Sequence, residues 1–586
     1  MNGQLLFILG AIVFCVIMIL ATYATNKSTH PKALFLLFFT EMWERFSFYG
    51  MRALLMLYMT SQLHYPDKQA NLTYGTYTAL VYLMPLFGGM IADKILGYRR
   101  AIVLGGILMA IGHFVLALPP SWSFFTGMAF LISGNGFFKP NISTMVGRLY
   151  PDGDNRRDGA FSIFYMGVNI GAFLSSLICG YIGQKGSETF SFMTPENSWH
   201  YGFGLAGVFM VLGLINFLSF KNLLGDIGLT PQSKSESTNN NTKSYAVYFL
   251  SLLIIPVFIF LFKNYTLMGY IMYPVFILAT MYCILLAEHP EQEIQKNSLI
   301  QFSIVYAIYV VIFLSEPIFN ISLNPVLFSI GDFTITLLLL YLIFLIGFLI
   351  FKSIQYVKKN EQYGGKQITA VVLVTFSIMF WAFYEQGGGS LNLFADRNVN
   401  MLGMGAAAVN NSINPLMVIL LSTPFAGLWL FLSKRGKEPS TPTKFGLSFV
   451  QLGAGFLLFV VGAKLATSAG QVSFTWFVLG YILLTTGELC LSPIGLSMIS
   501  KLSPPKITGM MMGFWFLASA MGQYLAGVVG TMMAIPSEGG ATTVSAVESL
   551  AIYSGVFMKI FYVSLGGGLV LLLLVPILKR WMGAVK

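Results

Sequence analysis

The chain has 586 residues, of which 56% are hydrophobic and 10% are charged, and its mean hydropathy is +0.74. No water-soluble globular domain of this size has such a composition, so the sequence predicts an integral membrane protein. The net charge of +11 would be compatible with a nucleic-acid partner in a soluble chain, but in a membrane chain it indicates cationic loops. The four cysteines lie far apart in apolar stretches and indicate neither a disulfide framework nor a zinc site.

Apolar runs of about 20 residues, the length that a helix needs to cross the hydrocarbon core, predict seventeen spans. The first is an additional N-terminal helix, for which a cleaved signal peptide is the alternative. In chain order, the spans are expected near 4–23, 34–62, 74–95, 100–118, 123–148, 160–183, 202–220, 245–262, 266–287, 299–315, 332–352, 368–392, 412–433, 446–463, 473–499, 508–534 and 550–578.

The distribution of Lys and Arg between alternate connections indicates the orientation of these spans. One set of connections holds about five times as many cations as the other, and cations accumulate on the cytoplasmic side of short loops. This places the C-terminus in the cytoplasm and removes the reason for a nucleic-acid role. The cation-poor set holds little more than Lys68, Lys185, Lys263, Arg397 and Lys464.

A polar low-complexity segment at 231–243 divides the spans into two groups. Four inserted spans follow it, and an even number preserves sidedness, so the last six spans begin on the same side as the first six. Two six-helix bundles in one orientation are the architecture of the major facilitator superfamily, an all-α integral membrane fold. The predicted organisation is an extra N-terminal helix at 1–30, an N-terminal bundle at 31–225, a linker and inserted helices at 226–365, and a C-terminal bundle at 366–586.

Charged residues deep in the membrane are the strongest functional signal, because each costs about 2.5–3.5 kcal/mol to insert. The N-terminal half is net cationic at this depth and the C-terminal half is anionic. A structural ion pair is the alternative for any single residue, but it does not explain this separation by sign. These residues are Glu41, Glu44, Arg45, Arg52 and Lys139 in the first half, and Glu385 and Glu488 in the second.

Cations on one wall of a central cavity and carboxylates on the other suit a zwitterion with separated charges. Arg52 and Lys139 are expected to hold its carboxylate, and Glu488 its amino group. A nearby cation lowers the proton affinity of a carboxylate. Proton binding by these glutamates would therefore be coupled to the formation of their ion pairs. The sequence therefore predicts a proton-driven carrier. A membrane-embedded enzyme is a weaker alternative, because no metalloprotease, nucleophile-elbow or paired-aspartate motif is present.

The chain contains, in this order, Glu41-x-x-Glu44-Arg45-Phe46-x-Phe48-Tyr49, a loop motif from Gly89 to Arg100, Phe164-Tyr165 with Asn169 and Gly171, Trp199–Phe203, Phe380–Gln386, Asn414-Pro415 and Gly487-Glu488 with Ser492-Pro493. These motifs, in this order, resemble those of the proton-dependent oligopeptide transporter family (POT/PTR2), a branch of the major facilitator superfamily. The resemblance covers roughly residues 30–225 and 365–580. It departs from the family pattern at Phe48, which replaces a tyrosine of the hallmark.

The resemblance implies roles for individual residues. Proton coupling is expected at Glu41, Glu44, Arg45, Lys139 and Glu385, and a conformational latch at Asp93, Arg99 and Arg100. Ion pairs of Arg52 with Glu385 and of Lys139 with Glu488 are expected as the cavity closes on one side. Substrate binding is expected at Tyr49, Arg52, Tyr82, Lys139, Asn169, Trp381, Asn414, Glu488, Ser492, Trp515 and Ser519.

The function that the resemblance implies is import of di- and tripeptides with protons by alternating access. The expected location is the bacterial inner membrane, as a multi-pass monomer in the lipid bilayer, with no cofactor or metal besides the coupling proton and no nucleic-acid partner. A carrier of another small zwitterion or anion, such as a peptidomimetic or nitrate, stays open as an alternative.

Overall fold

The computed structural model describes residues 3–151, 153–230, 237–288, 294–319, 321, 323–330, 333–504, 506–538 and 541–583. Long apolar segments can satisfy every backbone hydrogen bond internally only as helices, and most of the described chain is helical. Fifteen of these helices are long and apolar enough to cross a membrane. Two others, α2 (Lys32–Leu57) and α5 (Ser121–Arg148), contain charged residues in the middle of predicted spans.

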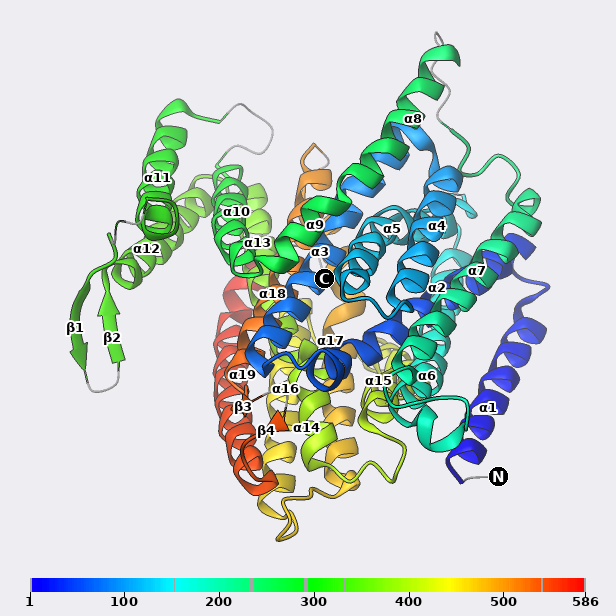
Figure 1. Ribbon diagram of the computed structural model, residues 1–586. Coiled ribbons are helices and arrows are strands. Elements are labelled where there is room, and N and C mark those ends of the chain that lie inside the picture. The colour runs from blue at the N-terminus through cyan, green and yellow to red at the C-terminus, as the bar shows by residue number, and fades with distance from the viewer. Residues whose placement is uncertain are drawn as a thin grey trace.

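The first bundle follows helix α1 (Gly3–Asn26), which lies at its side (Figure 1). Within the bundle α2 packs against α6 and α7, and α4 packs against α5 and α7. Short π-helical segments, η1 (Tyr58–Gln62) and η2 (Ala92–Leu96), extend two of its helices. The other helices of this half are α3 (Asp67–Ile91), α4 (Tyr98–Leu116), α6 (Arg156–Thr189), α7 (Ser198–Phe220) and the 3-10 turn η3 (Lys221–Leu224).

The second bundle packs α16 against α17 and α19, and α13 against α18. A short two-stranded connection precedes its last helix. Its elements are α13 (Glu361–Tyr384), η4 (Glu385–Gly388), α14 (Ser390–Asn398), α15 (Ala406–Lys434), α16 (Thr441–Lys464), α17 (Phe474–Leu502), α18 (Thr508–Thr531), β3 (Ser537–Glu538), β4 (Ala541–Thr542) and α19 (Ala546–Met582).

The inserted helices contact both bundles. Phe262 stacks on Phe125 of α5 with ring centroids 5.6 Å apart, and Phe276 stacks on Phe514 of α18 at 5.7 Å. Helices α11 and α12 and a β-hairpin project away from the body (Figure 1). The inserted elements are α8 (Ser237–Leu253), α9 (Ile255–Lys263), α10 (Thr266–Leu285), α11 (Lys296–Phe319), β1 (Val326–Ile330), β2 (Phe333–Thr336) and α12 (Leu337–Lys359).

Three predicted spans differ from the helices observed. The span near 245–262 is divided at Ile254 between α8 and α9. The span near 332–352 begins as strand β2, and its helix starts only at Leu337, after the Thr336 side chain accepts a hydrogen bond from the Leu339 amide. The span near 368–392 is interrupted: α13 ends at Tyr384, and a 3-10 turn leads into α14. Three successive glycines, 387–389, explain this break, because glycine is a poor helix former.

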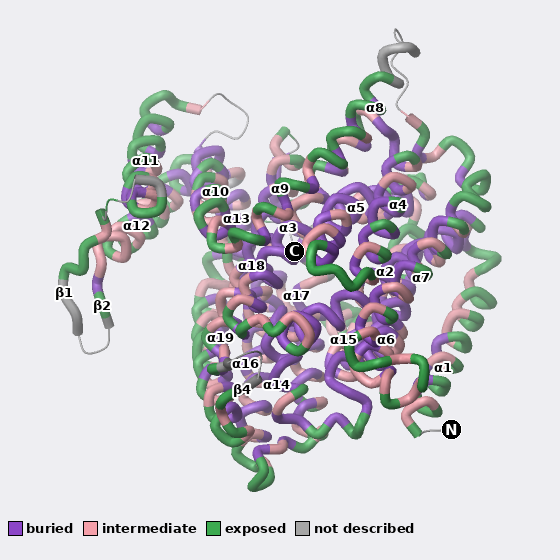
Figure 2. Tube along the Cα trace, viewed as in Figure 1, coloured by how far each residue is buried: buried purple, intermediate pink, exposed green. Residues whose placement is uncertain are grey.

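Small residues allow the two halves to approach closely. A Cβ on Gly75 of α3 would lie 2.9 Å from the Gly527 Cα of α18, and one on Gly180 of α6 would lie 2.6 Å from the Ala407 carbonyl carbon of α15. Figure 2 shows buried residues throughout the interior of both bundles. The core is therefore continuous across the two bundles, as expected for the major facilitator fold that the sequence predicts.

Candidate functional site

Three charged residues of α2 form a buried cluster near the middle of the helix. The Arg45 Nε atom lies 2.7 Å from Glu41 Oε1 and 2.9 Å from Glu44 Oε2, and all three side chains are at most 4% exposed. Glu41 Oε2, Glu44 Oε1 and Arg45 Nη2 nevertheless make no hydrogen bond with the described residues. Buried carboxylate oxygens without partners are costly, so this cluster would accept a proton or a further cation.

Lys139 of α5 lies beside this cluster without forming an ion pair with the described carboxylates. Its Nζ atom lies 4.3 Å from the centre of the Tyr82 ring of α3, so the cation rests on an aromatic face. Lys139 also interacts electrostatically with Glu41 and Glu44. The ammonium group is thus held close to two carboxylates while its hydrogen-bond donors stay available to a ligand.

A second group of charges joins the two halves. The Arg52 Nη2 atom of α2 forms a short ion pair with Glu385, the first residue of the turn that separates α13 from α14. Arg52 Nε donates to the Tyr74 hydroxyl at 2.6 Å, and Arg52 and Glu385 are both buried. The predicted pairing of Arg52 with Glu385 is therefore present in this conformation, whereas Lys139 and Glu488 do not form the ion pair also expected of them.

Glu488 of α17 instead belongs to a polar group within the C-terminal half. It accepts a short hydrogen bond from the Tyr384 hydroxyl and a 3.0 Å bond from Asn414 Nδ2. The same Asn414 nitrogen also lies 2.6 Å from the Tyr384 oxygen and 3.1 Å from Thr485 Oγ1. Asn414 and Tyr384 therefore fix the orientation of the carboxylate while Glu488 stays half-buried.

Most of the residues predicted to bind substrate are partly exposed, unlike the fully buried Glu44. Tyr49 connects the charged groups, since it interacts electrostatically with Arg45, Arg52, Glu385 and Glu488. The half-buried residues are Tyr49, Tyr82, Lys139, Trp381, Asn414, Glu488, Ser492 and Ser519.

Four residues predicted to bind substrate make local contacts in this conformation. Asn169 is buried and donates to the Tyr165 carbonyl oxygen of its own helix, and Ser519 donates to the Trp515 carbonyl oxygen. Trp515 is buried against Gly495, where a Cβ would overlap its ring. Trp381 meets the Phe380 and Tyr384 rings edge to face. A binding role for these residues stays a prediction.

The predicted latch residues lie within the first half. Asp93 accepts a 2.6 Å hydrogen bond from the Tyr98 hydroxyl, and Arg99 Nε donates to the Ile227 carbonyl oxygen at 2.8 Å. Arg100 is exposed. The role of these residues as a conformational latch stays a prediction.

One ion pair between the halves was missed by sequence reasoning. Asp67 of α3 accepts from Arg397 Nη1 at 2.6 Å and Nη2 at 2.8 Å, and also from the Ile535 amide at 3.0 Å. Asp67 is 2% exposed. Both residues had been assigned to connections, where charge is inexpensive, so hydropathy offered no signal for their pairing.

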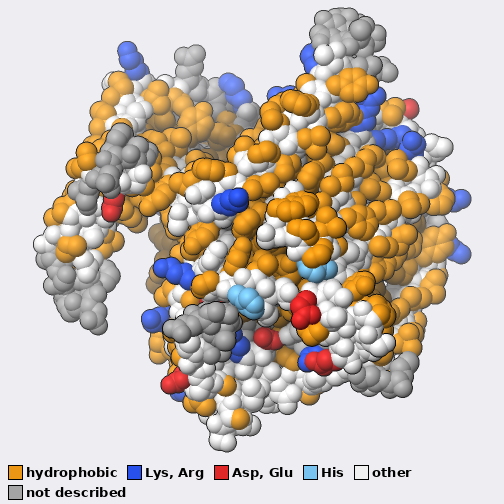
Figure 3. All heavy atoms as spheres, viewed as in Figure 1, with side chains coloured by type: hydrophobic (Ala, Val, Ile, Leu, Met, Phe, Trp, Pro, Cys, Tyr) orange, Lys and Arg blue, Asp and Glu red, His pale blue; other side chains and the backbone are white. Residues whose placement is uncertain are grey.

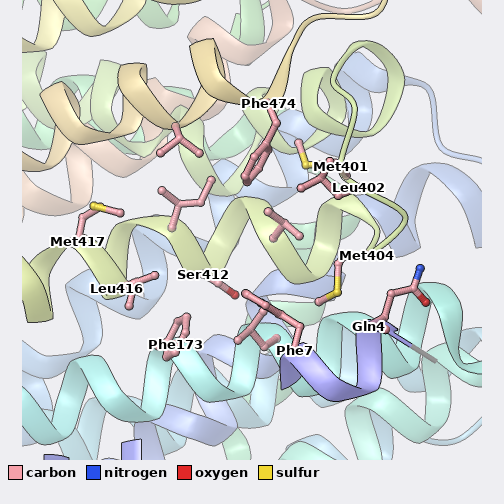
Figure 4. A pocket seen from close by; sticks show the side chains of 15 residues that line it. Gln4, Phe7, Phe173, Met401, Leu402, Met404, Ser412, Leu416, Met417 and Phe474 are labelled. Atoms are coloured by element: carbon pink, nitrogen blue, oxygen red, sulfur yellow. The ribbon is translucent and has the colours of Figure 1, made fainter. Parts of the chain in front are cut away.

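An apolar cavity of about 600 Å³ lies elsewhere, between α1, α6, α15 and α17. Figure 4 shows Phe7, Phe173 and Leu416 around it, with Gln4 and Ser412 as its polar side chains. None of the described residues that line it is ionisable, so it does not suit a zwitterion. Among the described residues, no three His, Cys, Asp or Glu side chains come together as metal ligands.

Comparison with curated proteins gives relatives along nearly the whole chain. "Peptide transporter YePEPT" of Yersinia enterocolitica is 32% identical over 86% of this chain and 88% of its own. "Uncharacterized transporter YclF" of Bacillus subtilis is 35% identical over 95% of this chain and 96% of its own. "Dipeptide and tripeptide permease B" of Shigella dysenteriae is 30% identical over 94% of this chain and 97% of its own.

Solved structures and a family model agree with these relatives. A crystal structure of peptide transporter POT in complex with sulfate has a TM-score of 0.66 and 31% identity, and covers 94% of this chain and 96% of its own. A POT family transporter in complex with 5-aminolevulinic acid has a TM-score of 0.65 and 28% identity, over 94% and 97% of the two chains. The family model described as POT family (PTR2) matches residues 99–264 and 334–545. The chain therefore belongs to the POT family of transporters.

Proposed function

We propose that this protein imports di- and tripeptides together with protons. The observation that carries the proposal is the Arg52–Glu385 ion pair between the halves, while Lys139 of the first half and Glu488 of the second form no ion pair with the described residues. The carboxylate of a peptide suits Arg52 and Lys139, and its amino group suits Glu488. The relatives support this class of substrate, because one is named a peptide transporter and another is named a dipeptide and tripeptide permease.

In the proposed mechanism, a proton on Glu385 releases Arg52, and the released guanidinium binds the carboxylate of the peptide. Protonation of Glu41 or Glu44 would likewise weaken their attraction for Lys139. Each carboxylate is close to a cation, so its proton occupancy depends on where that cation is bound. Rocking of the two bundles about this site then completes alternating access.

The orientation belongs to the same proposal. The N-terminal end of α3 and the C-terminal end of α14 lie on the side that the cation distribution predicts to be external. The Asp67–Arg397 pair and the close approach of Gly75 to Gly527 join the halves at that end. We infer that this conformation is closed to the outside, with the C-terminus in the cytoplasm of a bacterial cell and the inner membrane as its location.

Uptake into proteoliposomes tests the proposal. Vesicles loaded at neutral pH and diluted into acidic buffer should accumulate labelled dialanine, and a proton uncoupler should abolish the accumulation. Vesicles diluted into neutral buffer are the matched control. The absence of pH-driven uptake across a broad panel of di- and tripeptides would overturn the proposal.

Another small zwitterion is a second candidate, because one structural relative is in complex with 5-aminolevulinic acid, whose amino and carboxylate groups are also separated. Competition against labelled dialanine distinguishes the candidates. Dipeptides should compete far better than 5-aminolevulinic acid or nitrate, and the reverse order would reassign the substrate. We expect a monomer that needs no cofactor and transports its substrate without covalent change. Recovery of intact substrate after transport checks the absence of chemistry, and the mass of the detergent-solubilised protein checks the monomer.

A further inference from the structure

A pocket of about 570 Å³ opens at the end of the first bundle, far from the charged site between the halves. It lies between the beginning of α4, the end of α7 and the loop that follows η3, and Tyr248 of α8 closes one side. All three helices belong to segments apolar enough to span the membrane. The pocket therefore lies at a membrane surface, on the side that the cation distribution predicts to be cytoplasmic.

The lining changes in polarity with depth. Arg100 lies at the mouth, and Val103, Leu104 and Ile107 follow it on one face of α4 at helical spacing, over about 10 Å of helix. The same pattern runs from Lys221, at the start of η3, back to Leu218 and Phe217 at the end of α7. Cationic groups thus stand at the end of an apolar channel that enters the bilayer.

Two of the cations at the mouth of the pocket have no partner among the described residues. Arg100 and Lys221 are exposed, and neither forms an ion pair or hydrogen bond with the part of the chain that the structure describes. Among the described residues that line the pocket, three are cations and none is acidic, although the exposed Asp226 lies near Arg99. Figure 3 shows Lys and Arg side chains gathered beneath the upper end of α8.

The third cation, Arg99, is hydrogen-bonded to the loop that forms one wall of the pocket. Its Nε atom donates to the Ile227 carbonyl oxygen at 2.8 Å, and its Nη2 atom forms a short bond to the Gly225 carbonyl oxygen. Its amide donates to the Gly228 carbonyl oxygen at 3.0 Å. These three bonds fold the loop against α4, so the wall of the pocket is formed before any ligand binds.

We propose that this pocket binds an anionic phospholipid of the bilayer, with its phosphate on Arg100 and Lys221. One acyl chain would lie along Val103, Leu104 and Ile107. Basic pockets between membrane helices on the cytoplasmic side suit anionic headgroups, and the Ile107 and Leu218 side chains that line this pocket are exposed. A free phosphate ion would use the cations but not the apolar channel, which favours a lipid as the occupant.

Native mass spectrometry of the purified full-length protein tests the proposal, with phosphatidylglycerol and phosphatidylcholine as the added lipids. The double variant Arg100→Gln/Lys221→Gln should bind phosphatidylglycerol about 30-fold more weakly, since each cation near an anionic surface contributes about a fivefold change. The matched control is Lys434→Gln/Lys437→Gln, which removes two exposed cations at the end of α15. This control should retain wild-type affinity.

Two further arms separate the lipid from other anions. Ile107→Trp fills the apolar channel and should weaken phosphatidylglycerol binding without changing the response to inorganic phosphate. Inorganic phosphate should not displace the bound lipid. Equal loss in the control variant, equal affinity for phosphatidylcholine, or displacement by inorganic phosphate would each overturn the assignment.

Discussion

Arg52 on α2 and Glu385 at the start of the turn after α13 form a buried ion pair that joins the two halves of the transporter. Removing one partner of a buried pair leaves an uncompensated charge and costs about 3–5 kcal/mol. Protonation of Glu385 neutralises its carboxylate and releases Arg52. The guanidinium charge of Arg52 is not left uncompensated, because it can bind the carboxylate of a peptide. In the proposed mechanism, this pair connects proton binding to separation of the halves.

The first prediction is that Glu385→Gln abolishes proton-driven uptake of dialanine but preserves peptide counterflow. The amide introduced by this substitution cannot bind a proton, so the coupling between proton binding and peptide binding is lost. This coupling is typically about 1–3 kcal/mol, or about 5–150-fold in affinity, and the cationic groups that bind the peptide remain. Both activities are measured in proteoliposomes with labelled dialanine.

The control for this variant is Glu188→Gln, which neutralises a carboxylate that is 64% exposed in a surface pair. It should transport like the wild type. Parallel loss of uptake and counterflow in Glu385→Gln would show that the pair is structural and that the proton binds elsewhere.

The second prediction concerns Gly388, which permits the pair to form. A Cβ at this position would overlap the Tyr74 hydroxyl and lie 2.8 Å from Arg52 Nη2. Gly388→Ala should therefore displace Arg52 and reduce uptake at least about tenfold, the effect of about 1.4 kcal/mol. Gly427→Ala is the control, since a Cβ there meets nothing within 4 Å.

A double variant shows whether the overlap is the cause. Tyr74→Phe removes the hydroxyl, so Gly388→Ala/Tyr74→Phe should transport better than the sum of the two single effects predicts. Strict additivity would mean that Gly388 acts through backbone flexibility alone.

These residues show why sequence reasoning found part of the site and missed the rest. Arg52 and Glu385 were found because charges deep in a membrane are too costly to be incidental. Asp67 and Arg397 were missed because they lie at the ends of spans, where a solvated loop explains a charge equally well. The fold followed from span lengths and the distribution of cations, both of which are strong signals.

The missed elements had weaker or ambiguous signals. The hairpin of β1 and β2 is apolar and continuous with the following span, and hydropathy cannot separate a short apolar strand from a helix. The break at Glu385 was readable from the three glycines that follow Gln386, but a window of 20 residues averages over them. The distances between helices that bring Tyr74 to Gly388 depend on tertiary packing and are not encoded in any local pattern.

The third prediction is that Asp67 and Arg397 couple strongly. Asp67→Asn and Arg397→Gln should each destabilise the protein by about 3 kcal/mol, and the double variant by less than the sum. Thermal unfolding in detergent measures all three. The exposed Lys185–Glu188 pair provides the control cycle, with an expected coupling below about 1 kcal/mol. Equal coupling in the two cycles would remove the Asp67–Arg397 pair as a tie between the halves.

The fourth prediction concerns the aromatic face beneath Lys139. Tyr82→Phe keeps the ring and should leave peptide affinity nearly unchanged. Tyr82→Leu removes the cation–π contact of 4.3 Å and should weaken peptide binding, by about 0.5–2 kcal/mol. Competition binding with purified protein measures the affinities. Equal losses in the two variants would assign the role to the hydroxyl.

The fifth prediction concerns His30, which lies between α1 and α2, outside the spans. Its Nδ1 atom lies 2.7 Å from the Tyr150 hydroxyl, and the neighbouring Arg156 donates to the Thr29 carbonyl oxygen at 3.1 Å. Burial, and secondly the charge of Arg156, lower the pKa of His30 below its ordinary value of 6.5, although Asp154 opposes this shift. The folded protein therefore favours the neutral ring.

A pKa that is lower in the folded state gives stability that is present above the unfolded pKa and is lost as the pH falls through the folded pKa. The wild type should therefore lose more thermal stability between neutral and mildly acidic pH than His30→Gln, which cannot titrate. His64→Gln replaces an exposed histidine and should show the full pH response of the wild type. Melting curves of the three proteins in detergent across this range measure the difference. Identical pH responses in His30→Gln and the wild type would mean that protonation of His30 does not affect folding, because the cation is accommodated beside Asp154.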